Sequence, residues 1–261
     1  MSIVRAARLL ATATALALLA GACGDEGATV DDTVAKLAAA QAATEGAGSA
    51  RAAMTFEISS ESTGDIVFQM TGVVDLDSDA ARLSGDLSGM PGAGGRLDMI
   101  IVDGLAYVRA PGLPSLSGDR TWIKTDLTSP SAAGGSPFSQ DPSQSLMLLS
   151  AVKSARAQGR ATLRGEPTTR YEGVIDPSAI VGGQGDQSFE ALRRSGVEEI
   201  PFKAWIDGDG RVRKLEMSLQ ANPEGGDVSV RTMFELWDFG LEVDIRPPPE
   251  SKVQEAGKLG G

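Results

Sequence analysis

The chain has 261 residues, with 24 lysines and arginines against 35 aspartates and glutamates, no histidine and a single cysteine. Its 41% apolar and 23% charged residues are typical of a globular protein, not of a disordered or integral membrane protein. Without histidine, the chain cannot build a Ser-His-Asp triad or a histidine-ligated metal site. One cysteine excludes an intrachain disulfide and a thiolate metal cluster. The acidic excess disfavours binding to nucleic acid, because phosphates repel it.

The N-terminal residues have the layout of an export signal. Arg5 and Arg8 precede an apolar run at residues 9–22, and Cys23 follows it directly. The run counts 14 residues, whereas a helix that crosses roughly 30 Å of hydrocarbon needs about 20. The end of the run resembles a bacterial lipobox, with Ala20 where leucine is usual. This resemblance implies cleavage before Cys23 and acylation of its thiol.

The chain divides into four parts on this basis. We expect a signal peptide at residues 1–22, a lipidated tether at residues 23–29 and one folded domain at residues 30–246. Residues 247–261 open on three prolines and are expected to form a flexible tail. The protein would then be exported and anchored to the outer face of the cell membrane through Cys23. A plain secretory signal is the alternative, and it would leave that cysteine as a free thiol.

Apolar residues at every second position predict strands over most of the domain. The pattern is clearest at residues 65–76, and Asp103-Gly104 and residues 207–210 have the composition of hairpin turns. Similar alternation occurs at residues 54–58, 83–87, 97–101, 215–219, 228–236 and 241–245. The predicted fold class is α+β, with a large curved antiparallel sheet of about ten strands that forms a half-open β-barrel.

About three helices are predicted to cover the concave side of this sheet. The first spans residues 31–44, capped by Asp31 or Asp32. The second spans residues 141–156, where Asp141 precedes a proline and an apolar stripe follows. A short third helix is expected between Asp186 and Gly196.

The order of these elements, together with several short sequence patches, resembles the LolA-like lipoproteins of the LppX/LprG type. The patches are residues 104–108 (GLAYV), 121–124 (TWIK), 141–142 (DP), 168–173 (TTRYEG), 201–207 (PFKAWID), 210–213 (GRVR) and 245–248 (IRPP). The resemblance covers nearly all of the mature chain. It implies a half-open barrel with helices over its mouth, whose apolar cavity holds acyl chains of lipids or lipoproteins.

Ten apolar side chains on the predicted inner face are candidates for lining such a cavity. They are Phe56, Ile58, Ile66, Phe68, Met70, Leu97, Met99, Ile101, Leu146 and Leu149. Any one of them alone fits an ordinary hydrophobic core equally well. The cavity hypothesis therefore depends on the face as a whole.

Three other features have competing interpretations. Asp207 and Asp209 between glycines suggest a calcium loop, but residue 218 is a serine where that loop needs a glutamate, which favours a hairpin. Arg211 and Arg213, with Lys214 beside them, either meet a lipid headgroup or pair with carboxylates on a strand, and the acidic composition favours pairing. The three tryptophans, Trp122, Trp205 and Trp237, either line a lipid-facing rim or anchor packing.

The sequence predicts a binding protein and not an enzyme. It contains no nucleophile elbow, phosphate-binding loop or dinucleotide-binding motif, and nothing identifies a catalytic carboxylate pair. We expect a monomeric lipoprotein, without cofactor or metal, that binds an acylated lipid or glycolipid, with transfer between membranes as an extension of that role. The alternative is a surface-anchored protein-binding or sensor module whose core is filled by its own side chains.

Overall fold

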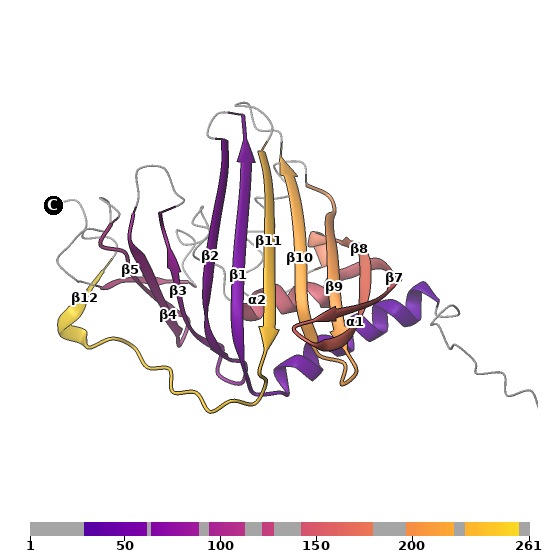
Figure 1. Cartoon of the computed structure of the whole chain (residues 1–261), viewed down its shortest axis with the longest axis horizontal. Coiled ribbons are helices and arrows are strands. Elements are labelled where there is room, and N and C mark those ends of the chain that lie inside the picture. The colour runs from indigo at the N-terminus through magenta and orange to yellow at the C-terminus, as the bar shows by residue number, and fades with distance from the viewer. Residues whose placement is uncertain are drawn as a thin grey trace, which may run out of the picture.

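The computed structural model describes residues 29–61, 64–88, 94–112, 122–127, 142–179, 197–221 and 228–255. Within these ranges the chain forms one twelve-stranded sheet and two α-helices (Figure 1). The strands are β1 (Ser49–Ser60), β2 (Gly64–Asp75), β3 (Ala80–Asp86), β4 (Arg96–Val102), β5 (Leu105–Arg109), β6 (Trp122–Asp126), β7 (Val152–Leu163), β8 (Glu166–Ile175), β9 (Ile200–Asp207), β10 (Val212–Ala221), β11 (Val228–Trp237) and β12 (Val253–Glu255).

The sheet is almost entirely antiparallel, as predicted, and among the described strands it ends at β12 on one side and at β7 on the other. Its strand order is β12-β6-β5-β4-β3-β2-β1-β11-β10-β9-β8-β7, and only the β12–β6 pair is parallel. Two meanders, β1 to β6 and β7 to β11, are joined where β1 pairs with β11. The edges at β7 and β12 leave the sheet open, so it is not a closed barrel.

The alternation in the sequence determines which side chains face inward. In the β1–β2 hairpin, Met54 lies opposite Met70 and Phe56 opposite Phe68, and all four are buried. The sheet is tightly paired at Gly72, where a Cβ atom would lie 1.9 Å from the carbonyl oxygen of Arg82. Only glycine therefore fits this position of β2.

The predicted turn between β4 and β5 is confirmed. Asp103 and Gly104 have φ angles of 53° and 71°, and Val102 pairs with Leu105 on either side of them. Two successive residues with positive φ match the twist of a tight antiparallel hairpin.

Helix α1 (Val30–Glu45) confirms the first predicted helix, but its N-cap is Thr29. The Thr29 hydroxyl oxygen accepts a hydrogen bond from the Asp32 backbone N–H at 3.2 Å, and the Thr29 backbone N–H donates to the Asp32 carboxylate at 3.2 Å. This reciprocal capping box places Asp32 in the first turn, so the prediction of Asp31 or Asp32 as the cap is wrong.

The second helix is much shorter than predicted. Helix α2 (Pro142–Met147) runs into a 3-10 turn, η4 (Leu148–Ala151), and the chain then becomes β7 at Val152. Val152 lies opposite Ile175, so pairing with β8 replaces the helix expected to continue to residue 156. The third predicted helix, at residues 186–196, lies outside the described residues.

Both helices pack on one face of the sheet, which we call the inner face. Helix α1 contacts β7, β10 and η4. Leu37 and Ala40 of α1, with Leu146 and Leu149 of α2 and η4, belong to the same buried cluster as the inward side chains of the strands. Of the helices in the described residues, none is long and apolar enough to cross a membrane.

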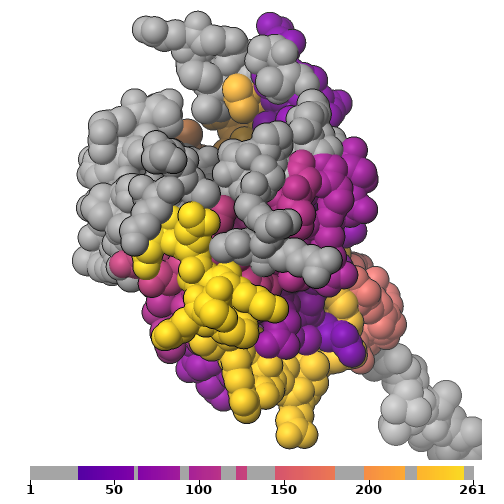
Figure 2. All heavy atoms as spheres, turned by 90° about the vertical axis from the view of Figure 1, so that its left-hand side faces the viewer, coloured from indigo at the N-terminus to yellow at the C-terminus, as the bar shows by residue number. Residues whose placement is uncertain are grey.

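The C-terminal segment takes a path that the sequence did not predict. Residues 241–249, expected to include a strand, contain none, and the segment runs past the strand ends from β11 to the far edge of the sheet (Figure 1). There β12 pairs with β6, which differs from the flexible tail expected from residue 247 onwards. Figure 2 looks onto this edge and shows the segment lying on the surface. Beyond the predicted strands the sheet contains β7, β8 and β12, and it lacks the strand expected at residues 241–245.

Candidate functional site

Eight of the ten candidate lining residues lie together in the main hydrophobic core. They are Phe56, Phe68, Met70, Leu97, Met99, Ile101, Leu146 and Leu149, each at most 4% exposed. They come from β1, β2, β4, α2 and η4, so the core joins one meander of the sheet to the second helix. The rings of Phe56 and Phe68 stack with centroids 6.5 Å apart.

The other two candidates, Ile58 and Ile66, are only half-buried and lie opposite each other beyond the two phenylalanines. Strand pairing places two further residues in line with them, because Ile58 also lies opposite Val230, and Val230 lies opposite Leu219. All four share the inner face, because each is two residues from a buried inward neighbour. We call Ile66, Ile58, Val230 and Leu219 the distal row.

The distal row is an apolar strip that the described part of the fold does not bury completely. Each of its four side chains is partly exposed, whereas the next row along the same strands, which includes the two phenylalanines, is buried. Val230 and Leu219 were not among the predicted site residues. Their strands show the required alternation, but only the pairing of β1 with β11 places them beside Ile58.

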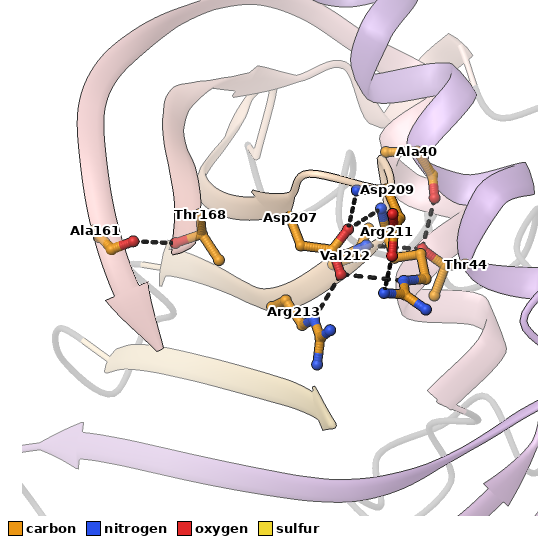
Figure 3. A network of polar contacts seen from close by, with 9 residues as sticks. All are labelled: Ala40, Thr44, Ala161, Thr168, Asp207, Asp209, Arg211, Val212 and Arg213. Carbon is orange, nitrogen blue, oxygen red and sulfur yellow. Dashed lines mark hydrogen bonds and ion pairs between the residues drawn. The ribbon is translucent and has the colours of Figure 1, made fainter. Parts of the chain in front are cut away.

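A polar cluster fixes the β9–β10 hairpin (Figure 3). The Asp207 carboxylate, whose side chain is 3% exposed, accepts hydrogen bonds from the backbone N–H groups of Asp209 and Arg211 at 3.0 and 2.9 Å. It also accepts from the side-chain Nε of Arg211 at 3.1 Å and of Arg213 at 2.7 Å. Arg211 also pairs with Asp209.

Burial acts to raise the pKa of Asp207, but the Arg211 N–H and the two guanidinium groups outweigh it and hold the pKa below its ordinary value. The lone pairs that a cation would need are therefore already used by donors. Within the described residues, no cluster of three or more acidic or cysteine side chains is placed to hold a metal ion. The hairpin interpretation is confirmed, and so is the pairing of Arg211 and Arg213 with a carboxylate.

The same hairpin holds the end of helix α1. The backbone N–H of Val212 donates to the Thr44 hydroxyl oxygen at 2.8 Å, and that hydroxyl donates to the Ala40 carbonyl at 2.6 Å. Thr44 is fully buried, so these bonds are shielded from water. The helix is thereby fixed over the β7–β10 half of the inner face.

The three tryptophans lie on the outer face of the sheet. Trp205 and Trp237 directly follow the inward residues Ala204 and Leu236, and Trp122 packs in a separate outer cluster. Cations cover their rings, with Arg109 over Trp122 at 4.9 Å, Lys214 over Trp205 at 5.2 Å and Arg164 over Trp237 at 3.8 Å. They are packing anchors and do not form a rim around the inner face.

Comparison with known proteins identifies the fold. No protein-family profile and no curated protein matches the sequence. Among solved structures, the chain is similar to the lipoprotein LppX of Mycobacterium tuberculosis, with 15% identity, a TM-score of 0.53 and coverage of 84% of this chain and 100% of that one. The chain therefore has the fold of LppX, which confirms the resemblance at the level of the fold.

Two further matches have lower scores. LprF from Mycobacterium bovis matches with 16% identity and a TM-score of 0.45, over 85% of this chain and 99% of that one. A LolA-superfamily protein from Nitrosomonas europaea matches with 9% identity and a TM-score of 0.32, over 81% of this chain and 95% of that one.

Proposed function

We propose that this protein is an exported lipoprotein, anchored to the outer face of the cell membrane through acylated Cys23, that binds acyl chains on its inner face. The export signal and the lipobox-like residues support the anchor, although Cys23 lies outside the described residues. The fold shared with a lipoprotein supports the same role. The ligand class is an acylated lipid or glycolipid, held without cofactor or covalent chemistry by a monomer.

The distal row is the observation that carries this proposal. Four aliphatic side chains continue the buried core toward the strand ends and keep part of their apolar surface exposed. Covering that surface with an acyl chain releases water at about 0.8 kcal/mol per buried methylene. A sixteen-carbon chain would gain on the order of 10 kcal/mol before ordering costs are subtracted. Transfer between membranes would require α2 and η4 to move, because Leu146 and Leu149 are enclosed in the core.

Two adjacent residues of β2 give a matched test of this face. Ile66 points inward in the distal row, and Val67 points outward with 55% of its surface exposed. A carboxylate within an acyl-binding face would be buried against hydrocarbon, which is strongly unfavourable. We expect Ile66→Asp to reduce co-purified lipid by about tenfold or more, and Val67→Asp to retain it.

The measurement is native mass spectrometry with organic extraction of the exported chain carrying Cys23→Ser, produced in a lipid-containing host. Near-stoichiometric acyl lipid in the parent and in Val67→Asp, with loss in Ile66→Asp, is the expected result. Equal lipid content in all three proteins would place the ligand away from the distal row and contradict the proposal. Circular dichroism of each variant checks that the sheet is retained.

A second candidate function is a surface-anchored protein-binding or sensor module with a filled core. The burial of the eight core candidates favours it, because these side chains already pack against one another. This function predicts a lipid-free mass for the parent protein and no uptake of added phospholipid or glycolipid.

A further inference from the structure

Tyr171 carries a polar atom to which the described part of the chain provides no hydrogen-bond partner. The residue is 1% exposed, and its hydroxyl oxygen is buried. Buried hydroxyl groups in native proteins are almost always paired, because an unpaired one loses its bonds to water without replacement. The position of this hydroxyl therefore requires an explanation, and a ligand atom would provide one.

The tyrosine lies on the inner face, and its two cross-strand partners are small. Ala157 of β7 and Ala204 of β9 are its cross-strand partners. Gly173, two residues further along β8, lies opposite Ala155, and a Cβ atom on it would be 2.1 Å from the carbonyl oxygen of Ser154. The two alanines leave Tyr171 as the only large side chain of β7 to β9 in its own cross-strand row, and Phe202, opposite Gly173, is the large side chain of the next row. Helix α1 lies over β7.

A lysine of helix α1 brings a positive charge close to the Tyr171 ring. Lys36 is exposed on α1, and its Nζ lies 5.6 Å from the centroid of the Tyr171 ring. The Tyr171 ring therefore lies between the buried core and a positively charged side chain of α1. An amphipathic ligand matches this arrangement, because its apolar chain would lie toward the core and its oxygen atoms toward the tyrosine and the lysine.

The tyrosine and the distal row are separated by a length suited to an acyl chain. Leu215 lies opposite Ala204, which lies opposite Tyr171, so the tyrosine is two strands away from Leu215. Leu219 of the distal row is four residues further along β10. With about 4.8 Å between strands and about 3.4 Å per residue, the two sites are about 17 Å apart along the sheet.

We propose that Tyr171 and Lys36 bind the carbonyl end of the acyl ligand, whose chain extends along the inner face toward the distal row. The phenol donates a hydrogen bond to the acyl carbonyl oxygen, and the ammonium group attracts a carboxylate where the ligand has one. This inference rests on the proposed function. The acyl carbonyl is common to a free fatty acid and a glycerolipid ester. Only the fatty acid carries a negative charge there, on its carboxylate group.

The test measures how three labelled ligands distribute between phosphatidylcholine vesicles and the exported chain with Cys23→Ser. The ligands are palmitate, methyl palmitate and hexadecane, which have a charged carbonyl group, a neutral one and none. Tyr171→Phe removes only the hydroxyl. Tyr107→Phe removes the same atom from the outer cluster and is the matched control. Unfolding in urea, in which Tyr171→Phe should be no less stable than the parent, shows that the fold is intact.

We expect Tyr171→Phe to weaken binding of both carbonyl ligands about three- to tenfold and to leave hexadecane binding unchanged, as one hydrogen bond would predict. Lys36→Gln should weaken palmitate binding alone, and a fatty acid would then be the preferred ligand source. Parent-like binding of both carbonyl ligands by Tyr171→Phe would overturn the inference while the proposed function stands. If the parent binds none of the three ligands, the proposed function fails and the inference fails with it.

Discussion

At the residue scale, the Asp207 carboxylate connects the β9–β10 hairpin to two arginine side chains. Its carboxylate is buried between two arginines and two backbone N–H groups at the hairpin that also holds helix α1 through Thr44. Removing one partner of a buried, hydrogen-bonded charge leaves the others without compensation. The effect would reach beyond the turn, because Val212 follows it directly and bonds to the helix.

We predict that Asp207→Ala lowers the free energy of unfolding by about 3 kcal/mol. Asp209→Ala is the matched control, because this neighbouring carboxylate has 72% of its side chain exposed and should change the free energy by less than about 0.5 kcal/mol. Urea denaturation followed by circular dichroism measures both values. Equal effects of the two substitutions would show that the buried ion pairs of Asp207 add nothing to the free energy of unfolding.

The parent protein and Asp207→Ala should also differ in how their stability depends on pH. The pKa of Asp207 in the folded state lies below its ordinary value, so the ionised form stabilises the fold above the unfolded-state pKa of about 3.9. This contribution is lost as the pH falls through the lower, folded-state pKa. We therefore expect the stability difference between parent and Asp207→Ala to shrink between about pH 5 and about pH 3. A difference that stays constant over this range would contradict the assignment.

At the element scale, the C-terminal segment completes an edge of the sheet. Ile245 and Val253 pack against an outer apolar cluster of Ile100, Tyr107 and Trp122, which the inner core does not reach. Strand β12 also pairs with β6 and so covers the backbone groups of an edge strand. The segment that contains the three prolines thus contributes to the fold through contacts on the outer face and through pairing at the sheet edge.

We predict that deleting residues 247–261 lowers the free energy of unfolding by about 2 kcal/mol, which corresponds to the loss of the partly buried Val253 side chain and of a short strand. Binding of a hydrophobic dye should increase, because the outer cluster becomes exposed. Deleting residues 256–261 alone retains β12 and is the control. Lipid content should be the same in both truncated proteins, because the deleted contacts lie on the face opposite the distal row.

At the scale of the whole molecule, net charge and the predicted anchor have opposite effects on attachment to a membrane. The formal net charge is −11, and removal of the signal would also remove two arginines, so anionic headgroups repel the folded domain. Stable attachment to a membrane then requires acyl chains, and two chains on one cysteine are sufficient.

We predict that the full chain fractionates with membranes and resists a high-salt wash, and that Cys23→Ser moves it to the soluble exported fraction. Fractionation and immunoblotting measure the distribution, with Ser2→Ala as a control that leaves the lipobox-like segment unchanged. Recovery of the unsubstituted protein in the soluble fraction would instead support a plain secretory signal.

The candidate site was only partly predictable. Ile58 and Ile66 could be chosen because alternation places them on the face of Phe56 and Phe68. Val230 could not be assigned as a neighbour of Ile58, because their contact joins strands from opposite ends of the domain. Tyr171 appeared in the sequence only as part of a short patch, since an unpaired hydroxyl is visible only when everything around it is placed.

The sequence by itself determined most of the antiparallel strands, the first helix, the Asp103-Gly104 turn and the layout of an export signal, because each depends on periodicity or residue type within a short stretch. Only the tertiary structure decided the end of the second helix at Met147 with the start of β7 at Val152, the parallel pairing of β12 and the composition of the distal row. The physical reason is that backbone pairing and burial between distant segments outweigh local preference. A stretch such as residues 146–152 has helical spacing, yet Val152 becomes a strand because Ile175 lies opposite it.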